Sequence, residues 1–313
     1  MKKTVSLILA LTMCLCGCLF AGCGSTQDNS SNADFAVAVC QLMEHDSLDK
    51  ATQGFVDALK KAMEDAGKTV SIDIQVAGEA NLCTTVVSAQ LAKNPDLIMG
   101  NATPALLAAA NATTSIPVLG TSVTDYADTF KNNIPANVSG TSDAVPFAEQ
   151  AQMMIDTLKL VEGDKVGVIY CSNESNSLIQ YNAVKALFEE KGIVVEAYTF
   201  SETTELQAVT NAAANACKAI YIPSDNTVAD NDSTVGIICD EKNVPVYTSY
   251  GGSICYASLA INYYELGAQT GKMAADILLG NKTVSDIEIV TITPTEVYNE
   301  ALCTKLGVET PEE

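Results

Sequence analysis

Short apolar runs alternate with amphipathic segments along most of the chain. Residues 35–40 (FAVAVC) form an unbroken apolar run, typical of a strand that is covered on both faces of a parallel sheet. In the segment that follows, the apolar residues fall on one stripe of a helix, and Gly67 is a stop signal past its end. The polar residues 44–47 lie between them. The pattern therefore predicts a strand, a turn and a helix, with the turn at the strand end where ligands bind in such sheets.

The same alternation continues to about residue 143. In this half we expect strands at residues 70–76, 96–99 and 116–119, and helices at residues 82–92 and 103–113. Pro104 lies in the first turn of the last helix, where its missing N–H group costs nothing.

The scheme begins again near residue 145. Here we expect helices at residues 147–160, 172–191 and 204–215, a further helix ending near 241, and strands at residues 166–170, 193–200, 219–222 and 244–248. The two halves also repeat each other, since residues 96–103 and 219–227 are both a buried strand followed by a polar turn. The chain is therefore predicted to be an α/β protein with two similar lobes and a ligand cleft between their polar turns.

The N-terminal segment has the features of an export signal. After two lysines, residues 4–20 are an apolar run too short for a comfortable transmembrane helix. The small residues directly before Cys23 resemble the lipobox of bacterial lipoproteins, which are cleaved before the cysteine and anchored by lipid on it. We therefore expect residues 1–22 to be a signal peptide and residues 23–33 to be a flexible polar tether. Cys18 is a rival anchor, and an ordinary secretory signal is the simpler alternative.

Composition excludes several classes of function. The 313 residues include 38 acidic and 17 basic side chains, for a net charge of −21, so phosphate backbones would repel the chain and nucleic acid is not an expected partner. His45 is the only histidine and no close cysteine pair accompanies it, so we expect no metal and no cofactor. Neither a GxSxG motif nor a Walker loop is present, and we predict that the protein is not an enzyme.

Seven cysteines follow Cys23, and none forms a CxxC motif. They are Cys40, Cys83, Cys171, Cys217, Cys239, Cys255 and Cys303. Many unpaired thiols in an exported protein would indicate a non-oxidising habitat. The sequence leaves open whether any of them pair.

Polar residues concentrate in the turns at predicted helix starts, where free backbone N–H groups suit a carboxylate. The candidate ligand contacts of this kind are Asn101, Thr103, Ser122, Asn176, Ser177, Ser224, Asn226 and Thr227. Glu44, Asp125 and Asp225 could accept hydrogen bonds from an ammonium group, and Asp225 is our first choice because it follows a buried strand of the second lobe. Each residue could instead be an ordinary helix cap.

Tyrosines also gather in or near these turns, where their rings could contact a planar ligand or pack at the lobe interface. They are Tyr126, Tyr221, Tyr250, Tyr256, Tyr263 and Tyr264, and we include Tyr250 among the candidate ligand contacts. His45 could also contact a ligand, although nothing near it in sequence forms a catalytic or metal-binding set.

Several short motifs carry a family resemblance when taken in order. They are EH at 44–45, QGF at 53–55, ATPA at 102–105, SVTD at 122–125, PSDNTV at 223–228 and INYYELG at 261–267. Together they resemble the ABC-transporter substrate-binding lipoproteins of the tryptophan/tyrosine-uptake type. The resemblance implies the type I periplasmic-binding-protein fold, with two Rossmann-like lobes of parallel sheets joined by a hinge, and an amino-acid-like, often aromatic, ligand. Asn262 stands where the family motif has Asp, and we include it as a candidate ligand contact.

The resemblance also implies that the chain crosses between the lobes at the hinge. The first lobe would contain residues 34–143 and 263–283, and the second would contain residues 144–262 and 284–313. Within the last range, residues 287–292 would be a strand of the second lobe and residues 299–306 a closing helix.

By the same resemblance, the protein would be an extracytoplasmic monomer, lipid-anchored to the bacterial cell membrane. It would close on an amino acid or similar small molecule and deliver it to an ABC permease and its ATPase. The alternative is a lipoprotein that uses the same clamp to signal to a membrane partner. The sequence does not identify the ligand.

Overall fold

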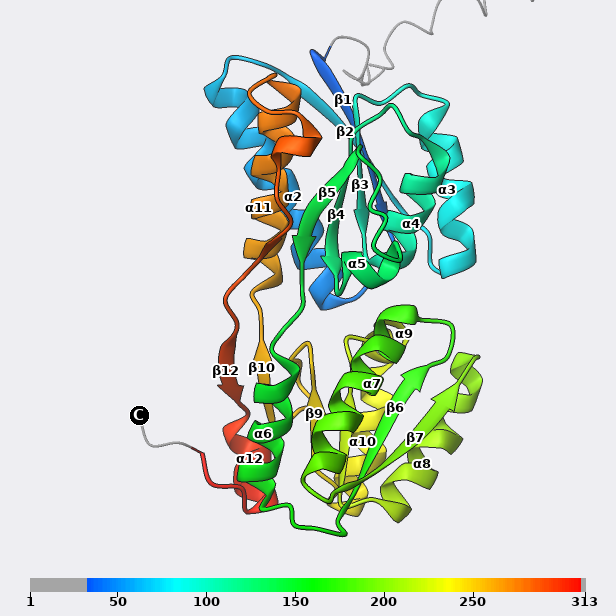
Figure 1. The fold of residues 1–313 in the computed structure, drawn as a ribbon, viewed down its shortest axis with the longest axis vertical. Helices are drawn as coiled ribbons and strands as arrows, with labels where there is room; N and C mark the ends of the chain where they lie inside the picture. Colours follow the sequence, from blue (N-terminus) through cyan, green and yellow to red (C-terminus); the bar gives the residue numbers. More distant parts are fainter. Residues whose placement is uncertain (1–32, 311–313) are drawn as a thin grey trace, which may run out of the picture. The chain divides into compact units, whose positions relative to one another are not determined.

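A computed structural model of the protein describes residues 33–310, which form two α/β lobes around two six-stranded sheets (Figure 1). The predicted fold class is therefore confirmed. The predicted signal peptide, the lipid anchor at Cys23 and all but one residue of the tether lie outside the described residues, so these stay predictions.

The first sheet consists of parallel strands only. From one edge to the other they are β11 (Val290–Thr291), β5 (Val138–Ser142), β4 (Val118–Val123), β3 (Leu97–Asn101), β1 (Phe35–Gln41) and β2 (Val70–Val76). Alternate residues of β1 enter two different cores, with Ala38 and Cys40 on one face and Val37 and Val39 on the other. Because both faces are covered, the strand reads as a continuous apolar run.

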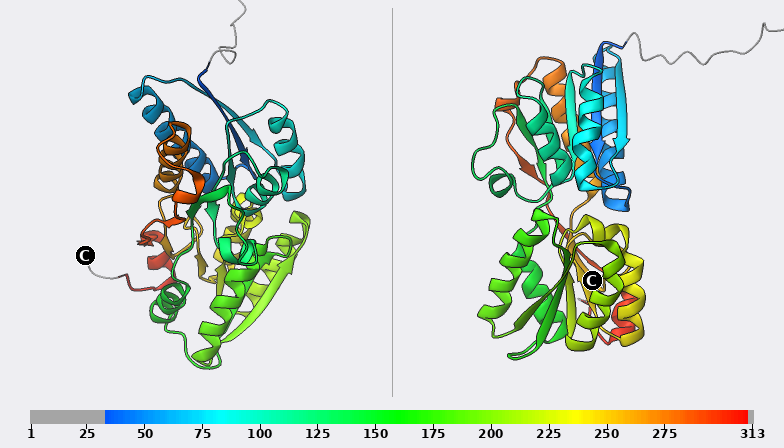
Figure 2. Two further views of the ribbon diagram at one scale, coloured as in Figure 1. Left: turned by 45° about the horizontal axis from the view of Figure 1, so that its top comes forward. Right: turned by 90° about the vertical axis from the view of Figure 1, so that its right-hand side faces the viewer.

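Helices cover both faces of this sheet, as the two views of Figure 2 show. They are α2 (Asp46–Asp65), η2 (Ala80–Leu82), α3 (Cys83–Leu91), α4 (Thr103–Ala112), α5 (Tyr126–Thr129), α11 (Tyr263–Leu278) and η4 (Val284–Asp286). The core with α3 and α4 lies on one face, and the core with α2 and α11 lies on the other.

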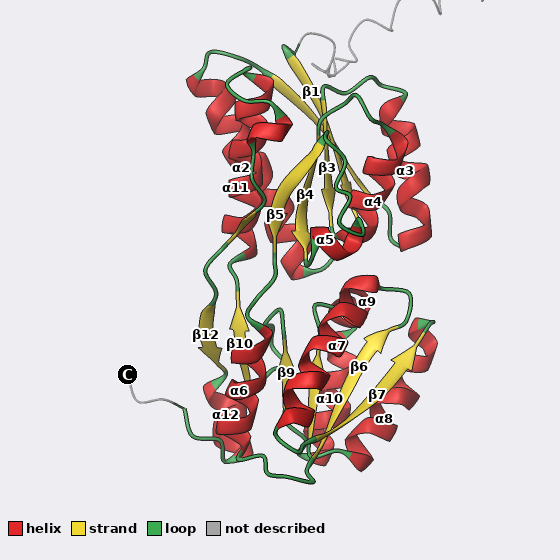
Figure 3. Cartoon of the chain, viewed as in Figure 1, coloured by secondary structure: helices red, strands yellow, loops and turns green. Residues whose placement is uncertain are grey.

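The second sheet repeats the arrangement with one antiparallel edge strand. Its order is β12 (Thr295–Tyr298), β10 (Ala257–Ala260), β9 (Val246–Thr248), β8 (Ala219–Ile222), β6 (Lys165–Cys171) and β7 (Val194–Phe200), with β12 antiparallel to β10. Its helices, red in Figure 3, are α6 (Phe147–Leu158), α7 (Ser175–Glu190), η3 (Thr203–Glu205), α8 (Leu206–Ala216), α9 (Asn226–Asp230), α10 (Asp232–Lys242) and α12 (Glu300–Leu306). The single helix expected to end near residue 241 is thus two helices, α9 and α10.

The chain passes between the lobes three times, after β5, after β10 and after β11 (Figure 1). The third passage corrects a prediction. Residues 287–292 were expected to add a strand to the second lobe, but β11 pairs with β5 of the first sheet, and only β12 and α12 belong to the second lobe. The reason is packing, because Ile287 and Val290 contact the first-lobe core, and the backbone oxygen of Ile287 accepts a hydrogen bond of 2.7 Å from Ser139.

Helices α2 and α11 are in backbone contact. A Cβ atom built on Gly267 would overlap the carbonyl oxygen of Ala51, and one on Gly54 would overlap the carbonyl oxygen of Tyr264. Glycine is therefore required on both helices for this close approach. Within the part of the chain that the structure describes, no helix is long and apolar enough to cross a membrane.

Candidate functional site

A cavity between the two lobes lies where the strands of both sheets end. From the first lobe it is lined by His45, Ser47, Leu48, Ser122 and Thr124. From the second lobe it is lined by Asn176, Ser224, Asp225, Asn226, Ala229 and Tyr250. Asp143 and Tyr263, from two of the segments that cross between the lobes, complete the wall. The space open to a water molecule in this cavity is only about 10 Å³, room for about one water, so the cavity is nearly closed in this structure.

Four buried polar atoms of this lining have no hydrogen-bond partner among residues 33–310. They are the hydroxyl oxygens of Ser122 and Tyr250 and the Oδ1 atoms of Asp143 and Asn176. Buried polar atoms in folded proteins are nearly always paired, because an unpaired one costs about 1–3 kcal/mol. Four such atoms around one cavity indicate a site for a polar ligand that completes their hydrogen bonds.

Asp143 is the carboxylate of this group. It directly follows β5, and its side chain is buried. The Tyr263 hydroxyl donates a hydrogen bond of 3.1 Å to Oδ2, while Oδ1 is unpaired within the described part of the chain. Burial raises the pKa of Asp143 to about 6, so the carboxylate is mostly ionised at neutral pH and can accept a hydrogen bond from a cation.

Ser122 is positioned by an irregular strand end. The register between β4 and β5 shifts between Gly120 and Val123. Within this irregularity Ser122 has a φ of 56°, in the left-handed region that residues other than glycine seldom adopt. Backbone strain of this kind is concentrated at binding sites, where it aims a side chain that a regular strand would direct elsewhere.

The second-lobe wall is organised around Glu174, the residue before α7. Its carboxylate accepts hydrogen bonds from the backbone N–H groups of Asn226 and Thr227 at 2.9 and 2.8 Å. It also accepts from the side-chain amides of Asn226 and Asn176 at 2.7 and 3.1 Å. Glu174 thus joins the start of α7 to the start of α9 at the edge of the cavity.

Asp225, our first choice for the ammonium contact, lines the cavity but acts as the N-cap of α9. Its Oδ1 accepts from the backbone N–H of Val228 at 2.9 Å. Its Oδ2 accepts from the backbone N–H of Cys171 at 2.8 Å and from the Ser177 hydroxyl at 2.7 Å. Burial and the neighbouring Glu174 raise the pKa of Asp225. Both of its oxygens are engaged within the second lobe, so Asp143 is the better acceptor for a ligand.

Two hydrogen bonds connect the lobes beside the cavity. His45 Nε2 lies 3.3 Å from Oδ1 of Asn226, and the Gln180 side-chain amide donates to the Thr124 hydroxyl at 3.3 Å. Because the nitrogen of the Asn226 amide faces Glu174, its oxygen faces His45, which assigns the His45 Nε2 proton as the donor. Burial lowers the pKa of His45, which favours the neutral ring in this arrangement.

The structure brings six of the thirteen sequence-predicted ligand contacts into the cavity wall. They are Ser122, Asn176, Ser224, Asp225, Asn226 and Tyr250. Two further candidates, Ser177 and Thr227, support this wall by donating to Asp225 and Glu174 at 2.7 and 2.8 Å.

The other five candidates lie outside the cavity wall. The Asn101 amide donates to the Leu48 carbonyl oxygen at 2.8 Å, so it holds the start of α2 within the first lobe. Asp125 and Asn262 are the N-caps of α5 and α11. Glu44 is exposed, and Thr103 is buried as the first residue of α4.

The six tyrosines considered above lie in the cavity wall, in the cores of the lobes or at the surface. Tyr250 and Tyr263 line the cavity, whereas Tyr221 and Tyr256 are fully buried in the second-lobe core and Tyr126 is buried in the first. Tyr264 is exposed and donates a hydrogen bond of 3.1 Å to Asp57.

Sequence reasoning missed Asp143 and Thr124 and gave little weight to His45. The available signal for Asp143 was a carboxylate after a strand, but the strand itself, VSGTS, has small and polar residues instead of an apolar run. Thr124 lies one residue past β4, inside a turn that the sequence did identify.

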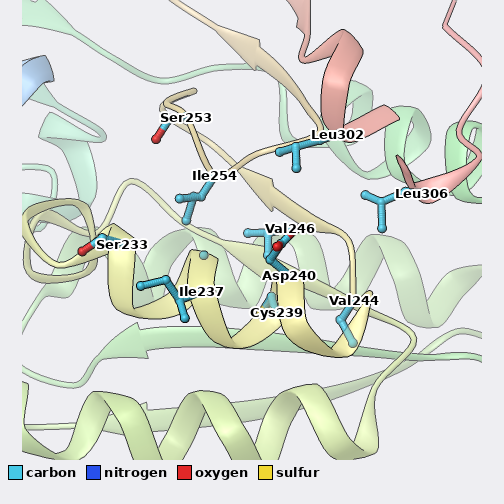
Figure 4. A pocket seen from close by; sticks show the side chains of 11 residues that line it. Ser233, Ile237, Cys239, Asp240, Val244, Val246, Ser253, Ile254, Leu302 and Leu306 are labelled. Atoms are coloured by element: carbon cyan, nitrogen blue, oxygen red, sulfur yellow. The ribbon is translucent and has the colours of Figure 1, made fainter. Parts of the chain in front are cut away.

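A second hollow lies in the second lobe alone, between α10, the start of β9, the loop before β10 and α12 (Figure 4). Its volume is about 290 Å³, and Ile237, Ile254, Leu302 and Leu306 give it an apolar lining. None of its lining residues is among the described residues that carry an unpaired buried polar atom. Its polar residues Ser233, Asp240 and Ser253 therefore do not present the unpaired buried atoms that are found in the inter-lobe cavity.

Within residues 33–310 all seven cysteines are buried, and no disulfide joins them. The same residues contain no group of three or more His, Cys, Asp or Glu side chains that could hold a metal ion.

The chain is similar to known proteins over nearly its whole length. Residues 36–313 match the protein family described as ABC transporter substrate binding protein. The chain is 31% identical over 316 residues to the tyrosine-binding protein of Clostridioides difficile strain R20291, covering 95% of this chain and 89% of that protein.

Two solved structures are informative about the lobes. A Streptococcus pneumoniae protein in complex with L-Trp has a TM-score of 0.81 and 29% identity, covering 90% of this chain and 97% of that one. A ligand-free, open substrate-binding protein from Clostridium difficile has a TM-score of 0.66 and 31% identity, covering 88% of this chain and 96% of that one. The two structures have nearly equal sequence identity to this chain, and the L-Trp complex has the higher TM-score.

Proposed function

Because this chain belongs to the family of ABC transporter substrate-binding proteins, we propose that its cavity binds a free amino acid with an aromatic side chain. The observation that carries the proposal is the set of four unpartnered polar atoms around one inter-lobe cavity in the described chain. A zwitterion requires both acceptors and donors, and this set contains both.

The ammonium group of the ligand would bind Oδ1 of Asp143 and Oδ1 of Asn176. Both atoms are buried acceptors, and Asp143 supplies the opposite charge. A charge-assisted hydrogen bond is shorter and about twice as strong as a neutral one. This pairing would also remove the cost of an unpaired buried carboxylate oxygen.

The carboxylate group of the ligand would accept hydrogen bonds from the hydroxyls of Ser122 and Tyr250. Neither lysine nor arginine is among the described residues that line the cavity, so neutral donors have this role. The rings of Tyr250, Tyr263 and His45 offer flat surfaces to an aromatic side chain. The tyrosine and L-Trp ligands of the two relatives named above support the choice of an aromatic amino acid.

Binding would be coupled to closure of the two lobes. Asp143 lies in a crossing segment, Ser122 belongs to the first lobe, and Asn176 and Tyr250 belong to the second. A ligand that contacts both lobes stabilises the arrangement in which they are close. Small-angle scattering should therefore give a smaller radius of gyration with saturating ligand than without it, and an unchanged radius would contradict the coupling.

The protein is extracytoplasmic, and we propose that lipid on Cys23 holds it at the cell membrane as a monomer. There it would deliver the amino acid to an ABC permease and its ATPase. The apolar run that ends in Ala-Gly-Cys and the polar residues after it support this anchor.

A thermal-shift screen of the twenty amino acids tests the proposed ligand class. A ligand at 100 times its Kd stabilises a protein by about 2.7 kcal/mol, so a true ligand should raise the Tm clearly. L-tyrosine or L-tryptophan should give the largest shift, and tyramine and 3-(4-hydroxyphenyl)propionic acid, which lack one charged group each, should give little. A screen in which no amino acid raises the Tm would overturn the proposal.

A further inference from the structure

Glu174 does not line the cavity, yet it contacts two residues that do. Its side chain is buried, and its Oε2 atom accepts from the amide nitrogens of Asn226 and Asn176 at 2.7 and 3.1 Å. Its Oε1 atom accepts from the backbone N–H and the hydroxyl of Thr227, both at 2.8 Å. Every one of these partners is a donor, as an ionised carboxylate requires.

These contacts determine which way two asparagine amides point. An ionised carboxylate accepts hydrogen bonds and donates none, so each amide must turn its nitrogen toward Glu174 and its oxygen away. For Asn176 the orientation is fixed twice, because the same nitrogen also donates to the carbonyl oxygen of Ser224 at 2.8 Å. Its oxygen is then the buried cavity atom without a partner in the described chain. For Asn226 the oxygen faces His45 at 3.3 Å.

The second-lobe wall of the cavity therefore offers an acceptor at Asn176 where a flipped amide would offer a donor. Across the cavity wall, Oδ1 of Asp143 is also an unpaired acceptor within residues 33–310. A group with several N–H bonds and a positive charge suits both atoms, whereas a methylene group or a carboxylate suits neither.

We propose that Glu174 is a positioning residue that sets the ligand specificity of the cavity by fixing the Asn176 amide together with the Ser224 carbonyl oxygen, so that the site selects a primary ammonium group over analogues that lack it. The inference rests on the proposed function, since it concerns the ammonium end of the amino-acid ligand. It goes beyond that function by assigning specificity to a residue that does not contact the ligand.

The test compares two ligands that differ only in the ammonium group, L-tyrosine and 3-(4-hydroxyphenyl)propionic acid, by calorimetry on the wild type and on Glu174→Gln. A glutamine in place of Glu174 keeps the shape but has one acceptor oxygen instead of two, so it cannot hold both asparagine amides and Thr227 at once, and the Asn176 amide depends more on the Ser224 carbonyl oxygen. The preference for L-tyrosine should fall roughly tenfold or more, the range expected when a hydrogen bond to a charged group is lost. Binding of the analogue should change little.

Thr227→Val is the matched control for a purely structural role. It removes the hydroxyl bond to Oε1 of Glu174, weakening the support of α9, but leaves both amides facing Oε2. This variant should have a lower Tm and an unchanged ratio of the two dissociation constants. If Glu174→Gln also leaves the ratio unchanged, Glu174 only supports α9 and the proposal is overturned.

Two further outcomes separate this proposal from the proposed function. If wild-type protein binds no amino acid, the proposed function fails. If Glu174→Gln does not fold, a crystal structure of the wild type with L-tyrosine decides the matter. The ammonium nitrogen should lie within hydrogen-bond distance of Asn176 Oδ1, and a carboxylate or ring at that position would overturn the inference.

Discussion

The hydroxyl of Tyr263 donates a hydrogen bond of 3.1 Å to Oδ2 of Asp143, and the two residues lie on different segments that cross between the lobes. Tyr263 is the first residue of α11, and Asp143 directly follows β5. The bond therefore joins two of the segments that cross between the lobes. It also directs Oδ1 of Asp143 toward the cavity, and this atom is unpaired among the described residues. A ligand ammonium bound there would contact the hinge itself.

Asp143→Asn should weaken ligand binding more than it weakens the fold. The substitution keeps the shape and removes the charge, so a charge-assisted contact in a closed cleft is lost, at about 2–5 kcal/mol of binding free energy. The ligand-free variant should be at least as stable as the wild type, because an unpaired buried carboxylate has been neutralised. Calorimetry with L-tyrosine measures the first effect and thermal unfolding the second. Asp125→Asn, at a helix cap outside the cavity wall, is the control, and equal Kd values for Asp143→Asn and the wild type would exclude the contact.

The raised pKa of Asp143 leads us to predict opposite pH dependences for the stability of the fold and for ligand binding. Burial raises the pKa of Asp143 from 3.8 to about 6, so the folded protein holds this proton more tightly than the unfolded chain does. Its contribution to stability is therefore fully present below pH 3.8 and is lost as the pH rises through about 6. Binding needs the ionised form, so the Kd should increase as the pH falls below about 6, approaching roughly tenfold per pH unit.

Asp143→Asn isolates this effect from other groups that titrate nearby. The pKa of His45 is lowered by burial, but the variant retains His45, so its effect is present in both proteins. Thermal unfolding and calorimetry between pH 5 and 8 measure the stability and the Kd of each protein. The wild type should show both pH dependences described above, and Asp143→Asn should lack them. Identical pH profiles for the two proteins would assign them to another residue.

About half of the candidate site could be predicted from the sequence, because these residues are marked by the pattern of their immediate neighbours in the chain. Ser122, Asn176, Asp225 and Tyr250 lie in turns between an apolar strand and the next element, and such turns are visible in the pattern of apolar and polar residues. The same pattern predicted both lobes and most of their strands. Helix caps have the same residue types, which is why Asn101 and Asp125 were also selected.

What the sequence could not show depends on long-range pairing. Strand β5 has small and polar residues and exists because it pairs with β4, so Asp143 at its end was not recognised. Strand β11 has only two residues, and it belongs to the first lobe because it pairs with β5. Apart from its bond to Asn176, the hydrogen bonds of Glu174 connect residues 52 or 53 positions apart in the sequence, and no local motif marks them.

Asp225→Ala should lower stability and leave affinity nearly unchanged. Three donors lose their acceptor, namely the backbone N–H groups of Val228 and Cys171 and the Ser177 hydroxyl, so the loss should exceed the approximately 1 kcal/mol of an ordinary helix cap. Urea unfolding and calorimetry measure the two quantities. Asn262→Ala, at the exposed N-cap of α11, gives the reference for a simple cap. A large increase in Kd with unchanged stability would restore Asp225 as the ammonium contact.

Gly267→Ala should destabilise the first lobe. The added methyl group would overlap the carbonyl oxygen of Ala51 on α2, so the two helices must separate, at a cost of about 1–3 kcal/mol. Urea unfolding measures the loss. Lys272→Ala, at an exposed position of the same helix, should stay within about 0.5 kcal/mol of the wild type. A variant as stable as this control would show that the helices can part freely.

Cys23→Ser should abolish lipid attachment. The proposed signal peptide is cleaved before Cys23, so the variant should accumulate as a precursor that metabolic labelling with a radioactive fatty acid does not mark. Cys18→Ser should be labelled and processed normally. The reverse result, with label lost only in Cys18→Ser, would move the anchor to Cys18.

The glycine contact between α2 and α11 has a mechanical consequence. Helix α2 begins directly after His45, which reaches α9 of the other lobe, and α11 begins at Tyr263 in a crossing segment. Since backbone touches backbone at Gly54 and Gly267, no layer of side chains is available to deform between them. The pair therefore behaves as one stiff block, and its cleft end carries both His45 and Tyr263, since both residues line the cavity. A rotation of the crossing segment before Tyr263 should therefore move His45 together with Tyr263, as parts of one rigid body.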